Sequence, residues 1–109
     1  MLDIIKTAQL IEMAIKKLGE EGKQLQALTE ANALASSEYD KHLGVTIAQL
    51  KGKGEPTTIV DKLAKGKCSD MLYQKILAEG MLKACYSNID RIKAQLNGYQ
   101  SINRHLDTT

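Results

Sequence analysis

Residues 50–67 read LKGKGEPTTIVDKLAKGK, and this stretch interrupts a chain that is otherwise patterned for helices. Gly52 and Gly54 are expected to end a helix, because glycine readily adopts the backbone conformation of a helix end. Pro56 then prevents a helix from resuming before it. Thr58 is expected to cap the short helix that follows. The stretch therefore predicts a link between two long helices.

The composition favours an all-α protein. Apolar residues make up 43 % of the 109 residues, which excludes a disordered chain, while Phe and Trp are absent and only four Tyr are present. A core must then come from Leu, Ile, Ala and Met, which suits helices better than a β-sandwich. The length predicts a single domain, 1–109.

Apolar residues on both sides of the link recur in steps of four and three, the heptad pattern of a helix face that packs on a partner. We expect a helix over about 2–50, a link with a short helix over about 51–68, and a helix over about 70–106. The expected inward row of the first helix is Ile4, Ala8, Ile11, Ile15, Leu18, Gly22 and Leu25, shifting afterwards to Leu28, Ala35, Tyr39, Leu43 and Leu50. The expected row of the last helix is Ala78, Leu82, Cys85, Ile89, Ile92, Leu96, Tyr99 and Leu106. The predicted fold is a long helical hairpin with a short connecting helix.

Both long helices carry a second apolar row that a two-helix hairpin leaves uncovered. We expect self-association into a helical bundle, most simply a homodimer of two hairpins or a higher oligomer. The alternative is a compact three-helix monomer, in which the short helix and a first helix bent near Gly19 and Gly22 cover these rows. The second rows are Leu10 and Met13 on the first helix, and Leu72, Ile76, Leu77 and Met81 on the last.

Charge and hydropathy restrict the surroundings of the protein. A net charge of +2 with interspersed signs is neither the surplus of a nucleic-acid polymer binder nor the acidity of a DNA mimic. No apolar run approaches the roughly 18 residues of a membrane span and no signal segment is evident, so we expect a cytoplasmic protein without membrane contact. The spacing of Cys68 and Cys85 fits neither a CxxC pair nor a zinc site, so both thiols are expected to be reduced and buried.

The lysines of the link make it a candidate contact for an anion, a nucleic acid or a protein partner. Helix N-termini with free amides attract anions, so GKGEPTT could hold a phosphate. It is not a Walker loop, because GxxxxGK[ST] is absent. The alternative is a solvated hinge that binds nothing. The candidate residues are Lys51, Lys53, Thr57, Thr58, Lys62, Lys65 and Lys67.

The end of the last helix, LNGYQSINRHLD, is a candidate protein-binding segment. Tyr and Arg are favoured anchors at binding surfaces. Tyr73 and Tyr86 are either half-exposed anchors of the same kind or residues at the margin of the core. The alternative is an ordinary helix end, with cationic residues placed against its negative pole. The candidate residues are Tyr99, Gln100, Asn103, Arg104 and His105.

The sequence offers no catalytic, metal or cofactor site. His42 and His105 lie far apart, and neither has a second metal ligand at helical spacing. Adjacent acids such as Glu20 and Glu21 diverge around a helix, so they do not converge on one proton or metal. We therefore expect a non-enzymatic protein without a cofactor.

Three segments together resemble small helical proteins of phages and prophages of Gram-positive hosts, which are often encoded beside single-strand-annealing recombinases. They are TIVDKLAKG, LAEGMLKAC and LNGYQSINRHLD. VDKLAKGKCSD follows the order of a basic link, a short helix and a long helix that begins with charged residues. The resemblance covers roughly the second half of the chain, implies the cytoplasm of a host cell, and supplies no catalytic motif.

Three function classes remain. The favoured class is a non-enzymatic phage-type binding protein that inhibits or adapts a host or phage protein, for example a nuclease or a defence complex. One alternative is an accessory protein in phage DNA recombination or replication that binds nucleic acid through the link. The other is an oligomeric protein that sequesters a nucleotide signal.

Overall fold

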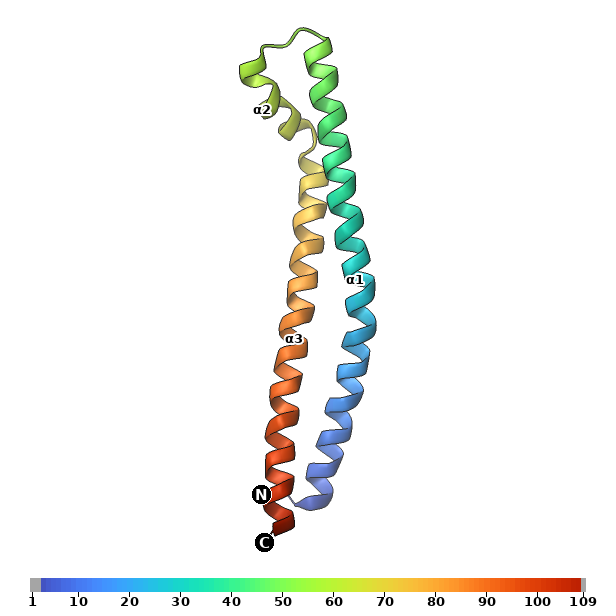
Figure 1. The fold of residues 1–109 in the computed structure, drawn as a ribbon, viewed down its shortest axis with the longest axis vertical. Helices are drawn as coiled ribbons and strands as arrows, with labels where there is room; N and C mark the ends of the chain where they lie inside the picture. The colour runs from blue at the N-terminus through green and yellow to red at the C-terminus, as the bar shows by residue number, and fades with distance from the viewer. Residues whose placement is uncertain (1–2, 109) are drawn as a thin grey trace. The chain divides into compact units, whose positions relative to one another are not determined.

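The computed structural model describes residues 3–108, and these residues are helical apart from short connections. The helices are α1 (Ile4–Gly52), α2 (Thr57–Lys67) and α3 (Ser69–Thr108) (Figure 1). The predicted all-α hairpin with a short connecting helix is confirmed. Residue 2, the predicted start of the first helix, lies outside the described residues.

The contacts within the chain divide it into two units. Unit 1 joins the residues up to Ala27 with those from Lys83 onward, and unit 2 comprises Leu28–Leu82. In both units a stretch of α1 packs against a stretch of α3 that runs in the opposite direction. The contact between Tyr39 and Lys75 in unit 2 is an example, with the Lys75 Nζ 5.1 Å from the ring centroid.

The first long helix ends where its glycines predict. Gly54 has a φ of +81°, a left-handed conformation that glycine adopts without steric cost. Its N–H donates to the Lys51 carbonyl at 3.1 Å, and the Glu55 N–H donates to the Leu50 carbonyl at 3.2 Å. The last carbonyls of α1 are therefore satisfied by the backbone of the link itself.

The predicted capping role of Thr58 is wrong. α2 begins at Thr57, Pro56 occupies the cap position with a φ of −58°, and no side-chain hydrogen bond caps the helix. The Ile59 N–H donates to the Pro56 carbonyl at 3.1 Å. Because proline supplies both the fixed φ and the first accepting carbonyl, the helix starts two residues earlier than a cap at Thr58 would allow.

The core of unit 2 lies where α2 packs on the end of α1. Leu50, Val60 and Ala64 form its buried cluster, and Leu43 and Ile47 pack against it. Val60 and Ala64 are four residues apart, so they share the face of α2 that meets α1. Figure 1 shows α2 beside the C-terminal part of α1.

In unit 1, four of the seven residues in the predicted inward row of α1 are exposed, and at three of these four the residue one position earlier is buried or half-buried instead. Ile11, Leu18 and Leu25 are partly buried, as expected for the inward row. Thr7 and Ala14 are buried and Glu21 is half-buried on the same row. The exposed residues that were predicted to lie inward are Ile4, Ala8, Ile15 and Gly22.

Local hydrogen bonding explains why a polar residue can occupy this row. The Thr7 hydroxyl donates to the Asp3 carbonyl at 2.7 Å, so its burial leaves no unsatisfied donor.

Burial continues along α1 through Leu28, Asn32 and Ala35 in the same steps of three and four residues. The predicted later row, Leu28, Ala35, Tyr39, Leu43 and Leu50, is therefore inward as expected, and it continues the observed earlier row without a shift.

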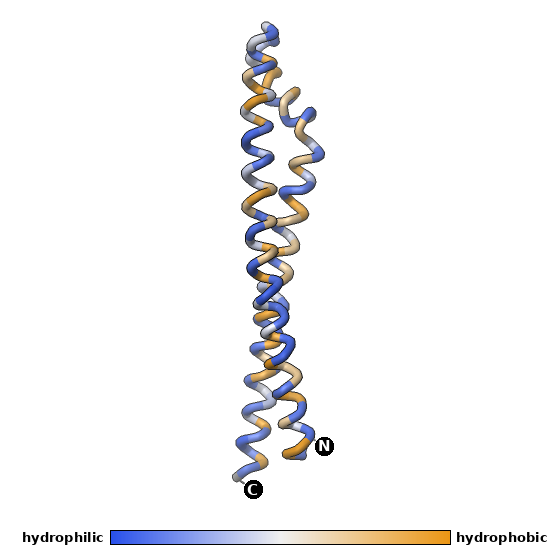
Figure 2. The backbone as a smooth tube through the Cα atoms, turned by 90° about the vertical axis from the view of Figure 1, so that its right-hand side faces the viewer, coloured by the Kyte–Doolittle hydropathy of each residue, from blue (hydrophilic) through white to orange (hydrophobic). Residues whose placement is uncertain are grey.

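The predicted inward row of α3 is confirmed, since all its members are buried or half-buried. Hydrophobic and hydrophilic segments alternate along both long helices (Figure 2). α1 is continuous through Gly19 and Gly22, so the first helix does not break there. Neither α2 nor a break in α1 covers the second apolar rows, of which Met13, Ile76, Leu77 and Met81 are exposed.

Candidate functional site

An exposed apolar face runs along the first part of α3, within unit 2. Tyr73, Ile76, Leu77, Gly80 and Met81 lie at positions i, i+3, i+4, i+7 and i+8, which share one side of a helix. Their four large side chains are between 44 % and 63 % exposed. A Cβ added at Gly80 would meet nothing within 4 Å. We call these five residues the α3 outer face.

The same stretch of α3 is apolar on its opposite side as well. Ala78 and Leu82, four residues apart, are partly buried on the side that meets α1. A helix with apolar residues on both sides is typical of one that packs between two neighbours. Full burial of a large apolar side chain is favourable by about 1.5–3 kcal/mol, so the α3 outer face offers a substantial free energy to a second neighbour.

The predicted C-terminal binding segment does not form one surface. Tyr99 and Asn103 are four residues apart and half-buried on the inward row of α3, whereas Gln100, Arg104 and His105 are exposed. The buried Oδ1 of Asn103 has no hydrogen-bond partner within the described part of the chain. Helical spacing therefore separates these residues into an inward pair and an outward group.

The link residues predicted to contact an anion are all exposed. The five lysines extend from the end of α1, the connection and α2, and none of them forms an ion pair with another described residue. The threonines Thr57 and Thr58 lie in the first turn of α2, which no side chain caps. The link is thus a solvated basic segment whose lysines are held in no common geometry.

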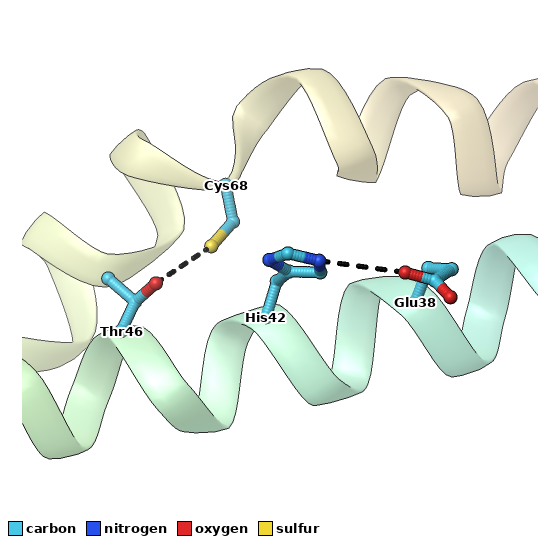
Figure 3. A network of polar contacts seen from close by, with 4 residues as sticks. All are labelled: Glu38, His42, Thr46 and Cys68. Carbon is cyan, nitrogen blue, oxygen red and sulfur yellow. Dashed lines mark hydrogen bonds and ion pairs between the residues drawn. The ribbon is translucent and has the colours of Figure 1, made fainter.

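Two separate polar contacts lie near the junction of α2 and α3, one within α1 and one between α1 and the junction (Figure 3). His42 Nε2 lies 3.5 Å from Glu38 Oε2, one turn away on the same helix, so the expectation that His42 has no second ligand group at helical spacing is wrong. One turn further, the Thr46 Oγ1 lies 3.6 Å from the Sγ of the buried Cys68. Cys68 therefore packs the junction against α1, as a structural thiol does.

The second thiol, Cys85, lies in unit 1 beside an acidic residue of α1. Its Sγ donates to the Glu21 carboxylate oxygen Oε2 at 3.4 Å and to the Glu21 carbonyl oxygen at 3.6 Å. Burial raises the pKa of the Cys85 thiol, and the hydrogen bond and negative charge of Glu21 raise it further. Cys85 is thus a protonated packing group and not an activated nucleophile.

An open groove of about 490 Å³ lies next to this pair. Its lining mixes positive, negative and amide groups, with no concentration of either charge. The lining residues are Lys17, Glu20 and Glu21 of α1 and Arg91, Ile92 and Gln95 of α3. Among residues 3–108, no group of three or more His, Cys, Asp or Glu could hold a metal ion.

Glu21 is a contact that the sequence analysis missed, because adjacent acids were compared only with each other. Its position supplied a signal: Leu18, Glu21 and Leu25 are separated by steps of three and four, which places the carboxylate on the inward row.

Replacing Glu21 by Gln is expected to increase the reactivity of Cys85. The change keeps the side-chain size and removes the negative charge, so the pKa of the thiol falls toward its ordinary value of 9.0. We expect iodoacetamide to alkylate Cys85 about two- to fivefold faster at pH 8, measured by site-resolved mass spectrometry. The exposed neighbour provides the control, Glu20→Gln, which should leave the rate unchanged. An equal rate in both variants and the parent would contradict the assigned influence of Glu21.

Comparisons of the chain with protein-family models, curated proteins and solved structures find no match. Within the described residues, no helix combines the length and the hydropathy needed to cross a bilayer. A function for this chain therefore has to be argued from its own surfaces.

Proposed function

We propose that the chain is a non-enzymatic binding protein that attaches to another protein through the α3 outer face and so inhibits or adapts that partner. The observation that carries the proposal is the exposure of Tyr73, Ile76, Leu77 and Met81 on one side of a helix whose other side is already packed on α1.

The chemistry of the α3 outer face fits an apolar partner surface. It contains no charged residue, and it combines Tyr with the flexible side chain of Met, both of which are enriched at protein interfaces. An amphipathic helix or an apolar groove of the partner would match its i, i+3, i+4, i+7 spacing. Gly80 would let the partner approach the helix backbone closely.

The resemblance to phage and prophage proteins supports a more specific version of the proposal. The partner is then a host or phage protein, such as a nuclease or a defence complex, and the encounter takes place in the host cytoplasm. Self-association belongs to the same proposal, through a surface other than the α3 outer face.

The test compares the parent protein with the double variant Ile76→Ser, Leu77→Ser as baits in a lysate of a Gram-positive host. Proteins held by the parent are identified by mass spectrometry, and their affinities for both baits are then measured with purified components. Two exposed apolar side chains at the centre of an interface contribute about 3 kcal/mol together, so we expect at least about 100-fold weaker binding by the variant. The matched control is Ile15→Ser, an equally exposed change on α1 that should leave the affinity unaltered.

Equal binding by the parent and the double variant, with both folded by circular dichroism, would contradict the proposal. The exposed lysines of the link favour nucleic acid as a second candidate ligand. In that case single-stranded DNA binds, the affinity falls steeply as salt rises, and replacing Lys51, Lys53, Lys65 and Lys67 by Ala abolishes it. Stabilisation of the protein by cyclic dinucleotides would instead indicate a sequestering protein.

A further inference from the structure

A second exposed row lies on α1 within unit 2, on the side of the helix away from its inward row. It steps by three and four residues, as a helix face that packs on another helix does. Leu34 is 64 % exposed and Val45 is 49 % exposed, and the other members are exposed as well. The row consists of Ala31, Leu34, Glu38, Lys41, Val45 and Ala48, and we call it the α1 outer row.

The α1 outer row is symmetric about its midpoint in residue type, except that its two central members carry opposite charges. Each outer end is an alanine, each next member is a large aliphatic residue, and the two central members are a glutamate and a lysine. Members of each matching pair lie at equal distances from the midpoint between Glu38 and Lys41. In two antiparallel copies of α1, Leu34 of one copy therefore meets Val45 of the other, and each Ala31 meets an Ala48.

We propose that the α1 outer row is a self-association surface, on which a second copy of this chain docks with its own α1 antiparallel to the first. Such a contact is isologous, because the same row is used by both copies. In heptad terms it matches each a position with a d position, the arrangement that antiparallel helix pairs require.

Charge complementarity indicates that the partner is a second copy of the chain and that the two α1 helices run antiparallel. In the antiparallel arrangement, Glu38 of each copy faces Lys41 of the other, which makes two ion pairs at the centre of the contact. A parallel arrangement would place Glu38 against Glu38 and Lys41 against Lys41, and like charges at such positions repel. Both residues are exposed, and Lys41 forms no ion pair with a described residue of its own copy.

The contact is of moderate size. Ala31 and Ala48 are 17 residues apart, which corresponds to about 26 Å of helix at 1.5 Å per residue. The alanines at both ends allow the two helix backbones to approach closely. A contact of this length with two large aliphatic residues per copy is small for a stable interface, so the dimer should be concentration-dependent.

This surface rests on the self-association part of the proposed function, for which it names the residues and the direction, and it does not involve the α3 outer face. A protein that dimerises but captures no partner would support the α1 outer row alone. A protein that captures a partner through α3 but stays monomeric would overturn self-association and the α1 outer row, and it would leave the proposed partner binding standing. The two proposals therefore fail separately.

The first experiment measures the mass of the full chain by sedimentation equilibrium up to about 200 μM, together with two charge reversals and their combination. Glu38→Lys and Lys41→Glu should each weaken the dimer at least tenfold, because each change places like charges at the centre. The double variant E38K/K41E restores the alternation of charge and should recover the parent's dimer. Glu12→Lys, an exposed reversal on α1 in unit 1, is the control and should leave the dimer unchanged.

The second experiment tests the direction of the pairing. A mixture of the variants Leu34→Cys and Val45→Cys should form a disulfide between copies under mild oxidation. Leu34→Cys alone should not, because its two copies would lie about 16 Å apart in the antiparallel arrangement, too far for a disulfide. The native thiols Cys68 and Cys85 are buried and should not interfere.

A monomeric mass at all concentrations would overturn the proposal. So would a dimer that tolerates both single charge reversals, or a Leu34→Cys variant that links to itself as readily as to Val45→Cys. Restoration of the dimer by E38K/K41E, joined to the mixed disulfide, would support it, since neither result is expected for another surface.

Discussion

Leu50→Ala is expected to lower the free energy of unfolding by about 3 kcal/mol, the largest loss that we predict for a single change. Leu50 is 5 % exposed and lies in the buried cluster with Val60 and Ala64, where α2 packs on α1. Truncation removes the contacts of a buried leucine and leaves a cavity that the helical backbone cannot close. Urea denaturation followed by far-UV circular dichroism measures the loss.

The control for this change is Ile5→Ala, at a position in α1 that is 73 % exposed. An exposed truncation of this kind should alter the free energy of unfolding by no more than about 0.5 kcal/mol. If Leu50→Ala were as mild as Ile5→Ala, the packing of α2 on the end of α1 would be wrong.

Replacing Gly19, Gly22 and Gly98 by Ala is expected to raise the free energy of unfolding by about 2–3 kcal/mol. Each glycine lies inside a helix, where Ala is more favourable by about 1 kcal/mol because it loses less backbone entropy on folding. A Cβ added at any of the three would meet nothing within 4 Å. Thermal unfolding of the triple variant should show a higher Tm than the parent.

The matched control has the opposite sign. Gly54→Ala places a side chain at a φ of +81° in the link, and it should lower the free energy of unfolding by about 1 kcal/mol although its Cβ also meets nothing within 4 Å. A loss of stability in the triple variant would show that another helix packs closely on those glycines, contrary to the structure.

The outward positions show where sequence reasoning was incomplete. Ile76, Leu77 and Met81 were recognised as an uncovered row from their spacing alone. Tyr73 could be assigned to this row only from its exposure in the structure. From the sequence alone, an aromatic residue beside an inward row could equally lie at the margin of the core. In the C-terminal segment, Tyr99 and Asn103 lie inward and their neighbours outward, so its five candidate residues do not share one surface.

The sequence by itself determined the link and the hairpin. Gly52, Gly54 and Pro56 act through the conformations that their own backbones allow, and these restrictions are local, so they can be read without knowing any partner. The inward row of α3 could also be predicted from the sequence, because its apolar residues keep the same spacing of three and four residues from Ala78 to Leu106.

Only the tertiary structure decided which residues of α1 face inward in unit 1. Thr7 and Glu21 are polar, and a polar residue can be buried only when a partner satisfies its hydrogen-bonding groups. Those partners are the carbonyl of Asp3 and the thiol of Cys85, the second of which is 64 residues away in sequence. Hydrophobic spacing therefore favoured Ala8 and Gly22 in their place, since the compensation comes from contacts that the spacing of α1 alone does not contain.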